Sequence, residues 1–471
     1  MTNKGFLSGR DKELHEMAEQ YEATKAENKP IYLDADDLAD LSDWYAVRSK
    51  YNLAAEVAEY GLKLHPDNTG LLVQQAYLYM DTQDKEMAWH IANKIHEDSP
   101  EVKILKANLL LAEDKIEDAE ELLDTIEDKE DLANIVEVAY MYIDMGYPEK
   151  ALTWLSRGEE KYAEEEAFLA VTGDCYHARR LNEEAASCFN KLIDKNPYSA
   201  PYWFGLARCY FDQQMFDKVI EACDYAIIAD DEFADAYIMK GHSFYQLGNE
   251  ESALECYQQA QQFNAISPSF INSFIGLNKI FKEEWEEGLK YLEEAIISKK
   301  DEDALTLPSL YANAALCLHK MGKKRQAHQY CKKAHALNPE EADPYLIEGR
   351  IYMEEKNYEK GVKQWAKALE LAPYAETWHE IGMYSMEIGQ LSYARLAFER
   401  VKKMEPEYQG INEKLASLYM LLKDKENFLK YNQLCEQPFD LNELQKLQQI
   451  LEDEDKGDLA KAMKTIFESL K

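Results

Sequence analysis

The chain has 471 residues, with 53 Lys and Arg against 89 Asp and Glu and a formal net charge of −36 at pH 7. This acidic excess argues against nucleic-acid binding, because a protein needs many basic side chains to neutralise phosphates. No apolar stretch suits a signal peptide or a membrane span, so we expect a cytoplasmic protein without membrane contact.

The first predicted element is a helix near the N-terminus. Ser8 and Asp11 have the spacing of a capping box, which predicts a helix continuing to about Lys25. We assign residues 1–34 to a capping helix in front of the main body of the chain.

From residue 35 onward, the sequence repeats with a period of about 34 residues. One block contains Trp203, Leu206, Ala207, Tyr210, Val219 and Ala226, and the next contains Tyr237, Gly241, Phe244, Ala253, Tyr257 and Ala260. A period of this length indicates a stack of small helical units, each unable to bury its apolar face alone. It predicts most of the fold and argues against an enzymatic function.

The unit that ends at Pro197 illustrates the physical reason for the pattern. Gly173 and Ala185 occupy points where two helices must approach closely, so a larger side chain would push the helices apart. Tyr176 and Phe189 are the bulky side chains that fill the space between helices. Pro197 lacks the donor needed to continue a helix and ends the unit.

The same pattern returns further along the chain. The sets are Tyr311, Ala315, Leu318, Gly322, Ala327, Cys331, Ala334 and Pro339; Tyr345, Gly349, Tyr352, Gly361, Trp365, Ala368 and Pro373; and Trp378, Gly382, Gly389, Ala394, Phe398, Val401 and Pro406. The pattern resembles the tetratricopeptide repeat family. The resemblance implies an all-α, right-handed superhelical solenoid of about twelve helix-turn-helix repeats with helical caps. We expect the array to cover residues 35–437, with repeats starting near residues 35, 69, 100, 132, 166, 200, 234, 269, 308, 342, 375 and 409.

Two places depart from the regular pattern. A longer step separates the repeats near residues 298–308, and both a lengthened loop and a hinge between two sub-arrays fit it. Beyond the array, Asp440 with Glu443 opens a further predicted helix. We therefore assign residues 438–471 to C-terminal capping helices.

No catalytic, cofactor or metal site is predicted. The chain contains no Gly-rich phosphate loop, GxSxG elbow or HExxH motif. His328, Cys331 and His335 share a helical face, yet Cys331 is at a core position of its repeat. The eight cysteines follow the repeat rather than a CxxC spacing, which predicts buried, reduced thiols.

The resemblance also implies where a partner binds, because first helices line the inner surface of such arrays. The candidate groove residues, expected to be exposed, are Tyr140, Asp174, His177, Phe204, Arg208, Phe211, His242, Tyr245, Phe281, His319 and Arg350. Aromatic, His and Arg side chains are typical of binding hot spots. For each residue, ordinary solvent-facing polarity or packing between repeats is the alternative. The Lys, Asn and Arg set with which co-chaperones of this family hold a carboxylate is incomplete here.

A basic segment interrupts the acidic background. Residues 304–339 contain no Asp or Glu, and they include Lys320, Lys323, Lys324, Arg325, Lys332 and Lys333. This basic patch could bind an acidic partner segment, or it could pair with acidic side chains of neighbouring repeats. Both alternatives remain open at this point.

These features predict a non-enzymatic scaffold that binds a protein or peptide through the inner groove. Two alternatives remain: a structural subunit that assembles through its convex surface or its ends, and a regulatory array that acts on an enzyme in trans. The partner's identity and the oligomeric state are not determined by the sequence.

Overall fold

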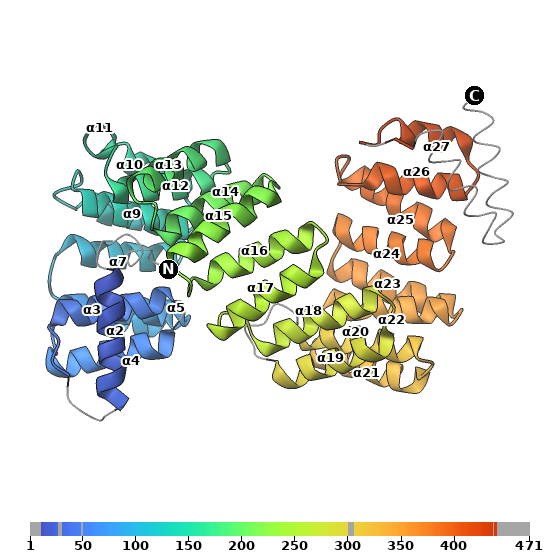
Figure 1. The fold of residues 1–471 in the computed structure, drawn as a ribbon, viewed down its shortest axis with the longest axis horizontal. Helices are drawn as coiled ribbons and strands as arrows, with labels where there is room; N and C mark the ends of the chain where they lie inside the picture. Colours follow the sequence, from blue (N-terminus) through green and yellow to red (C-terminus); the bar gives the residue numbers. More distant parts are fainter. Residues whose placement is uncertain (1–10, 27–30, 49, 300–305, 437, 440–471) are drawn as a thin grey trace. The chain divides into compact units, whose positions relative to one another are not determined.

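The computed structural model describes residues 11–26, 31–48, 50–299, 306–436 and 438–439. Every regular element in these ranges is a helix (Figure 1). The predicted all-α solenoid of helix-turn-helix repeats is therefore confirmed as a fold class. The chain divides into two compact units, unit 1 (Met1–Ala265) and unit 2 (Ile266–Lys471), which are described separately.

Unit 1 begins with α2 (Asp11–Ala26), which packs on α3, and continues as helix pairs joined by short turns. The pairs are α3 (Ala35–Val47) with α4 (Tyr51–Leu64), α5 (Thr69–Asp81) with α6 (Lys85–Ala92), α7 (Pro100–Leu111) with α8 (Ile116–Leu123), α9 (Leu132–Asp144) with α10 (Pro148–Leu155), α12 (Glu166–Ala178) with α13 (Asn182–Lys195), α14 (Ala200–Asp212) with α15 (Phe216–Ala229), and α16 (Ala234–Gln246) with α17 (Glu250–Gln262). The short α11 (Glu159–Tyr162) lies between α10 and α12.

Unit 2 is built in the same way. Its pairs are α18 (Pro268–Phe281) with α19 (Trp285–Ser298), α20 (Leu307–Lys320) with α21 (Lys324–Leu337), α22 (Ala342–Glu354) with α23 (Tyr358–Leu371), α24 (Ala375–Glu387) with α25 (Leu391–Met404), and α26 (Ile411–Leu421) with α27 (Lys425–Asn432). The Ser8 capping box, residues 300–305 of the longer step and the helices expected after Asp440 lie outside the described residues. The two units meet at residue 265, one repeat before that longer step.

The ends of the helices follow from local chemistry. Asp34 Oδ1 accepts a hydrogen bond of 2.8 Å from the backbone N–H of Asp37, and Asn68 Oδ1 accepts one of 3.0 Å from that of Leu71. Such side chains satisfy backbone donors that have no partner within the helix. Gly322 follows α20 with a φ of 78°, a conformation that side chains with a Cβ adopt at a cost.

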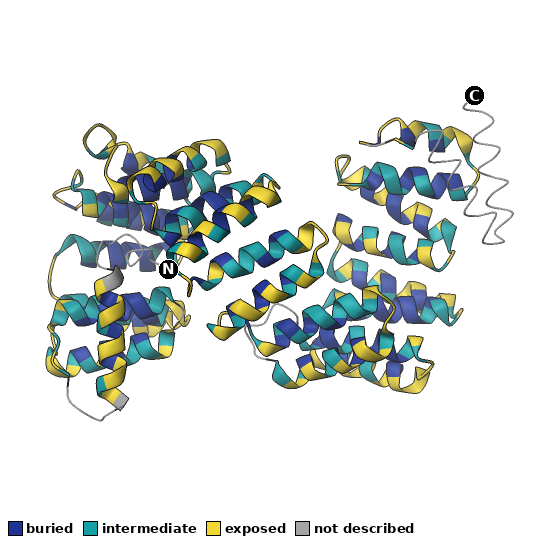
Figure 2. Ribbon diagram, in the orientation of Figure 1, coloured by how far each residue is buried: buried dark blue, intermediate teal, exposed yellow. Residues whose placement is uncertain are grey.

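Helix pairs can pack closely because small residues stand where the predicted repeat requires them. In Figure 2, buried residues recur along the longer helices of both units. An added Cβ at Gly173 would meet the Phe189 ring at 3.2 Å, which agrees with the predicted close approach. The closest approach to this ring is at Gly205, where an added Cβ would lie 2.3 Å from Phe189 Cε1. One ring therefore fills the space beside two consecutive first helices.

None of the helices in the described part of the chain combines the length and the apolar character that a bilayer crossing requires.

All eight cysteines are buried and free, as the repeat positions predict. Burial raises the pKa of the Cys209 thiol to about 12 and that of Cys317 to about 12. Because the thiolate is the reactive form, we expect the native protein to react slowly with a thiol reagent at pH 8. After denaturation, all eight should react rapidly. A spectrophotometric thiol assay measures both, and rapid labelling of most thiols in the native state would contradict the burial.

Candidate functional site

A cavity of about 200 Å³ lies among the first helices of unit 1. It is lined by Tyr140, Ala170, Asp174, Phe189, Pro201, Tyr202, Phe204, Gly205, Arg208, Phe233 and Asp235. These residues come from α9, α12, α13 and α14 and from the start of α16. We call this site the unit 1 cavity. It brings together Tyr140, Asp174, Phe204 and Arg208 of the predicted groove residues.

The floor of the cavity is a polar network around Asp174. Arg208 Nη1 donates to Asp174 Oδ1 over 3.0 Å, and the Tyr140 hydroxyl donates to Asp174 Oδ2 over 3.3 Å. Both oxygens of this buried carboxylate are therefore engaged. Burial raises the pKa of Asp174, while the charge and hydrogen bond of Arg208 and the hydrogen bond from Tyr140 act against this rise.

His177 extends the network away from Asp174. Its Nδ1 lies 2.8 Å from Arg208 Nη2, and its Nε2 lies 3.4 Å from Asp212 Oδ2. Burial and the charge of Arg208 lower the pKa of His177, which favours the neutral ring. A neutral ring can accept the Arg208 hydrogen bond at Nδ1, and this arrangement orients the guanidinium beside the cavity.

Aromatic rings form one wall of the cavity. Phe204 and Phe233 meet edge to face, with ring centroids 5.3 Å apart and an interplanar angle of 74°. Pro201 and Tyr202 continue this wall, and the Tyr202 hydroxyl donates to Glu166 Oε2 over 2.9 Å. The wall offers an apolar surface beside a polar floor, which is the composition typical of ligand sites.

Sequence reasoning missed Phe233 and Asp235. Both belong to the repeat after Arg208, at the point where α16 begins. Neither residue is at one of the first-helix positions that the repeat pattern indicates, because the cavity is also lined by the start of the following helix. The sequence does contain one signal for them, because Phe233 and Asp235 flank the predicted repeat start near residue 234.

The remaining groove residues of unit 1 lie outside this cavity. Phe211 packs edge to face on Phe216, with centroids 5.7 Å apart. His242 Nδ1 lies 2.7 Å from the Tyr257 hydroxyl, and Tyr245 is exposed. These residues make local contacts within one or two helix pairs.

Most groove residues differ from the expectation of exposed side chains, because only Tyr245 and Phe281 are exposed. Tyr140, Asp174 and Arg350 are buried, and the other six are partly buried. Each of the three buried residues makes polar contacts with the following repeat: Tyr140 with Asp174, Asp174 with Arg208, and Arg350 with Glu387. The alternative of packing between repeats therefore accounts for a part of the predicted set.

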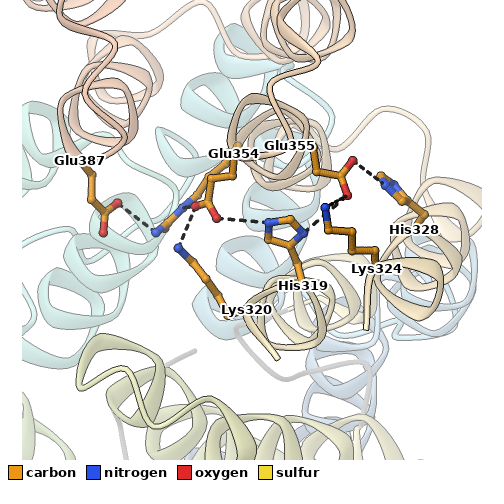
Figure 3. Close-up of polar contacts among 8 residues, drawn as sticks. His319, Lys320, Lys324, His328, Glu354, Glu355 and Glu387 are labelled. Atoms are coloured by element: carbon orange, nitrogen blue, oxygen red, sulfur yellow. Dashed lines mark hydrogen bonds and ion pairs between the residues drawn. The ribbon is translucent and has the colours of Figure 1, made fainter. Parts of the chain in front are cut away.

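Unit 2 holds His319 and Arg350 in an ion-pair network. Figure 3 shows His319 pointing toward Glu354 within this network. Glu354 lies at its centre, with His319 Nε2 at 3.2 Å, Lys320 Nζ at 3.0 Å and Arg350 Nε at 3.1 Å from its oxygens. Arg350 Nη2 also pairs with Glu387 at 2.9 Å. The remaining groove residue of unit 2, Phe281, is exposed at the end of α18.

The pKa of Glu354 reflects these contacts. Burial would raise it, but hydrogen bonds from His319 and Lys320 and the charges of Lys320 and Arg350 outweigh burial and lower the pKa to about 2. The carboxylate is therefore ionised at neutral pH. It links α20 to α22 through opposite charges that are largely shielded from water.

A second group of contacts surrounds Glu355 and Glu348 in the same unit. His328 Nε2 lies 3.2 Å from Glu355, and His335 Nε2 lies 2.9 Å from Glu348. Within the described residues, no three His, Cys, Asp or Glu side chains are arranged to hold a metal ion. His328 and His335, which share a face with Cys331, are engaged by carboxylates of the next repeat.

All six residues of the predicted basic patch are exposed. Lys320 lies 3.0 Å from Glu354 and Lys324 lies 3.9 Å from Glu355, so these two have acidic neighbours in the next repeat. Lys333 lies over the rings of Tyr311 and Tyr330.

Parts of this chain are similar to known proteins. Models of the tetratricopeptide repeat match residues 176–232, 234–266 and 308–341. DnaJ homolog subfamily C member 7 of Homo sapiens is 23% identical over 227 residues, which cover 46% of this chain and 44% of that protein. Anaphase-promoting complex subunit 7 of Dictyostelium discoideum is 21% identical over 248 residues, which cover 52% of this chain and 41% of that protein.

The chain spans less than half the length of these curated relatives. Among solved structures, one chain in the crystal structure of the APC/C hetero-tetramer Cut9-Hcn1 is similar to this chain. The alignment covers 82% of this chain and 96% of that chain, at 14% sequence identity and a TM-score of 0.34.

Proposed function

Because the chain is a tetratricopeptide repeat protein, we propose that it is a non-enzymatic scaffold that binds a protein or peptide on the first-helix face of unit 1. The unit 1 cavity is the observation that carries this proposal. Four residues selected from the sequence as partner-binding positions line it together, although they come from three different helices. A site built across successive repeats suits an extended segment that runs along the array.

The chemistry of the cavity favours binding over catalysis. Asp174, its most deeply placed carboxylate, already accepts hydrogen bonds from Arg208 and Tyr140. A general base needs a free lone pair directed at substrate, and these contacts use the carboxylate to orient its neighbours instead. The aromatic wall then supplies apolar contact area, and the polar floor supplies orientation.

The first-helix face of unit 2 supports a different role. His319, Lys320 and Arg350 are engaged with Glu354, so binding a partner through them would require breaking contacts within the chain. We therefore place the partner site in unit 1. Unit 2 then supplies a rigid stack of repeats held together by its own ion pairs.

We expect Phe204→Ala to weaken partner binding by about 1–3 kcal/mol, because this ring forms the cavity wall. Phe281→Ala is the matched control, since Phe281 is an exposed ring on a first helix of unit 2. Quantitative mass spectrometry of proteins captured by immobilised wild type and by both variants identifies the partner. Titration of that purified partner then gives the affinity, and thermal melts establish that both variants fold.

Proteins that depend on the proposed site should be retained by wild type and by Phe281→Ala and lost with Phe204→Ala. Equal capture by folded Phe204→Ala would contradict the proposal. That result would favour the alternative of a subunit that assembles through another surface or through the ends of the array.

A further inference from the structure

We propose that the unit 1 cavity receives a lysine or arginine side chain, and therefore that the bound segment is basic. This inference rests on the proposed function, because it names the chemistry of the partner at the same site. It follows from three features of the cavity: the balance of charge in its lining, the aromatic wall, and the acidic side chains around it.

The charged residues that line the cavity do not balance. They are two carboxylates, Asp174 and Asp235, and one guanidinium, Arg208. Asp174 and Arg208 neutralise each other in the 3.0 Å ion pair at the floor. Asp235 carries the remaining charge and is exposed in the first turn of α16. When all three are ionised, the lining has one negative charge in excess, which a cationic side chain would neutralise.

Carboxylates also lie beyond the lining, together with the basic Arg180, whose charge acts on His177. Asp144 is close enough to contribute, with Asp174, to the raised pKa of the Tyr140 hydroxyl, although burial is the main cause of that rise. Glu166 accepts the Tyr202 hydroxyl, and Asp212 lies beside His177. These carboxylates increase the negative potential at the cavity and favour the approach of a basic segment.

The shape of the wall suits the body of a long basic side chain. Phe204, Phe233 and Pro201 present apolar surface for a methylene stem, and the ring faces attract a cation. The end of such a side chain could reach Asp235 while its stem stays on the rings. An uncharged apolar side chain would fill the same space but would remove water from Asp235 without replacing it.

The state of Asp235 supports this assignment. Asp235 is exposed to solvent, yet the protein atoms around its carboxyl remove part of its hydration and raise the pKa of that group. A cation placed beside this group would favour the ionised form and offset the loss of water. An acidic or neutral ligand would provide no such compensation, which is why we commit to a basic one.

The test uses the full-length protein and fluorescein-labelled nonapeptides of alanine and serine. One peptide carries three arginines at alternate positions. The matched control peptide carries citrulline, a neutral arginine analogue, at the same positions. We expect Asp235→Asn to weaken binding of the arginine peptide about tenfold, measured by fluorescence anisotropy at fixed ionic strength. The matched control is Asp231→Asn, which removes the same charge from an exposed position that does not line the cavity.

With Asp231→Asn, the affinity should change by less than about twofold, because a long-range charge effect is screened by salt. The citrulline peptide should bind wild type weakly and be insensitive to Asp235→Asn. Equal weakening by both Asp variants would overturn the proposal, since it would show attraction to the acidic chain as a whole. Equal binding of the citrulline and arginine peptides to wild type would also overturn it.

Failure here is distinguishable from failure of the proposed function. If partner capture depends on Phe204 while the arginine peptide is indifferent to Asp235, then the scaffold function holds and the basic chemistry is wrong. If neither Phe204 nor Asp235 affects binding, both proposals fail.

Discussion

Replacing Glu354 by Gln is expected to destabilise the α20–α22 contact in unit 2 by about 3 kcal/mol. The carboxylate is bound by His319, Lys320 and Arg350, and the His319 and Arg350 side chains are each only 8% exposed. A neutral amide would leave these donors without a charged partner in a poorly hydrated place. Hydrogen exchange of the two helices, followed by mass spectrometry, measures the local opening free energy.

Glu370→Gln is the matched control in the same unit. Glu370 pairs with Lys367, but its side chain is 70% exposed, so its loss should cost at most about 1 kcal/mol. If the two variants exchange alike, the Glu354 network does not hold the repeats together.

The effect of Glu354 should also depend on pH in a defined direction. Its pKa is about 2 in the folded protein, compared with 4.5 for an ordinary glutamate. A lowered pKa means that the stabilising contribution is fully present above pH 4.5 and is lost as the pH falls through 2. The contribution of the Glu354 charge to the difference in opening free energy between wild type and Glu354→Gln should therefore decrease as the pH falls below about 4.5. A difference that grows with acid would contradict the assigned pKa.

A single methyl group at Gly205 is expected to destabilise unit 1 by about 1–3 kcal/mol. The added Cβ would lie 2.3 Å from Cε1 and 2.6 Å from Cδ1 of the Phe189 ring, so either the ring or the helix must move. Phe189 is 3% exposed, although its ring also lines the unit 1 cavity. Local hydrogen exchange of α12–α14 measures the effect.

Gly70→Ala provides the comparison for Gly205→Ala. An added Cβ at Gly70 would meet its nearest neighbour, Asn68 Oδ1, at 3.5 Å, which is an ordinary contact. Alanine favours a helix over glycine, so this variant should be neutral or more stable by up to about 1 kcal/mol. Equal stability of the Gly205→Ala protein would mean that the two first helices are not packed as tightly as the structure indicates.

The fold could be predicted from the sequence because its information is local and repeated. The repeat starts near residues 200, 234 and 342 lie at or beside the observed starts of α14, α16 and α22. Glycine and alanine at fixed offsets indicate close helix contacts, and proline marks the ends of units. The burial of all eight cysteines follows from the same offsets.

The site could be predicted only in part. Tyr140, Asp174, Phe204 and Arg208 were selected from the repeat and do line one cavity. His319 and Arg350 occupy comparable first-helix positions in unit 2, yet both are bound to Glu354. The repeat pattern assigns the same role to equivalent positions, because it does not specify which charged side chains of the next helix come within reach.

The sequence by itself thus determined the helix pairs, their order and the small residues at their contacts, since these depend on neighbours within a repeat or on the next one. Only the tertiary structure decided that Phe233 and Asp235 complete a cavity with Arg208, and that Lys320 and Lys324 are paired within the chain. The physical reason is that a helix pattern indicates which face a residue occupies. Whether that residue can bind a partner depends on whether it forms an ion pair with a side chain of the next repeat. Such pairs depend on distances of a few ångströms, which the pattern does not specify.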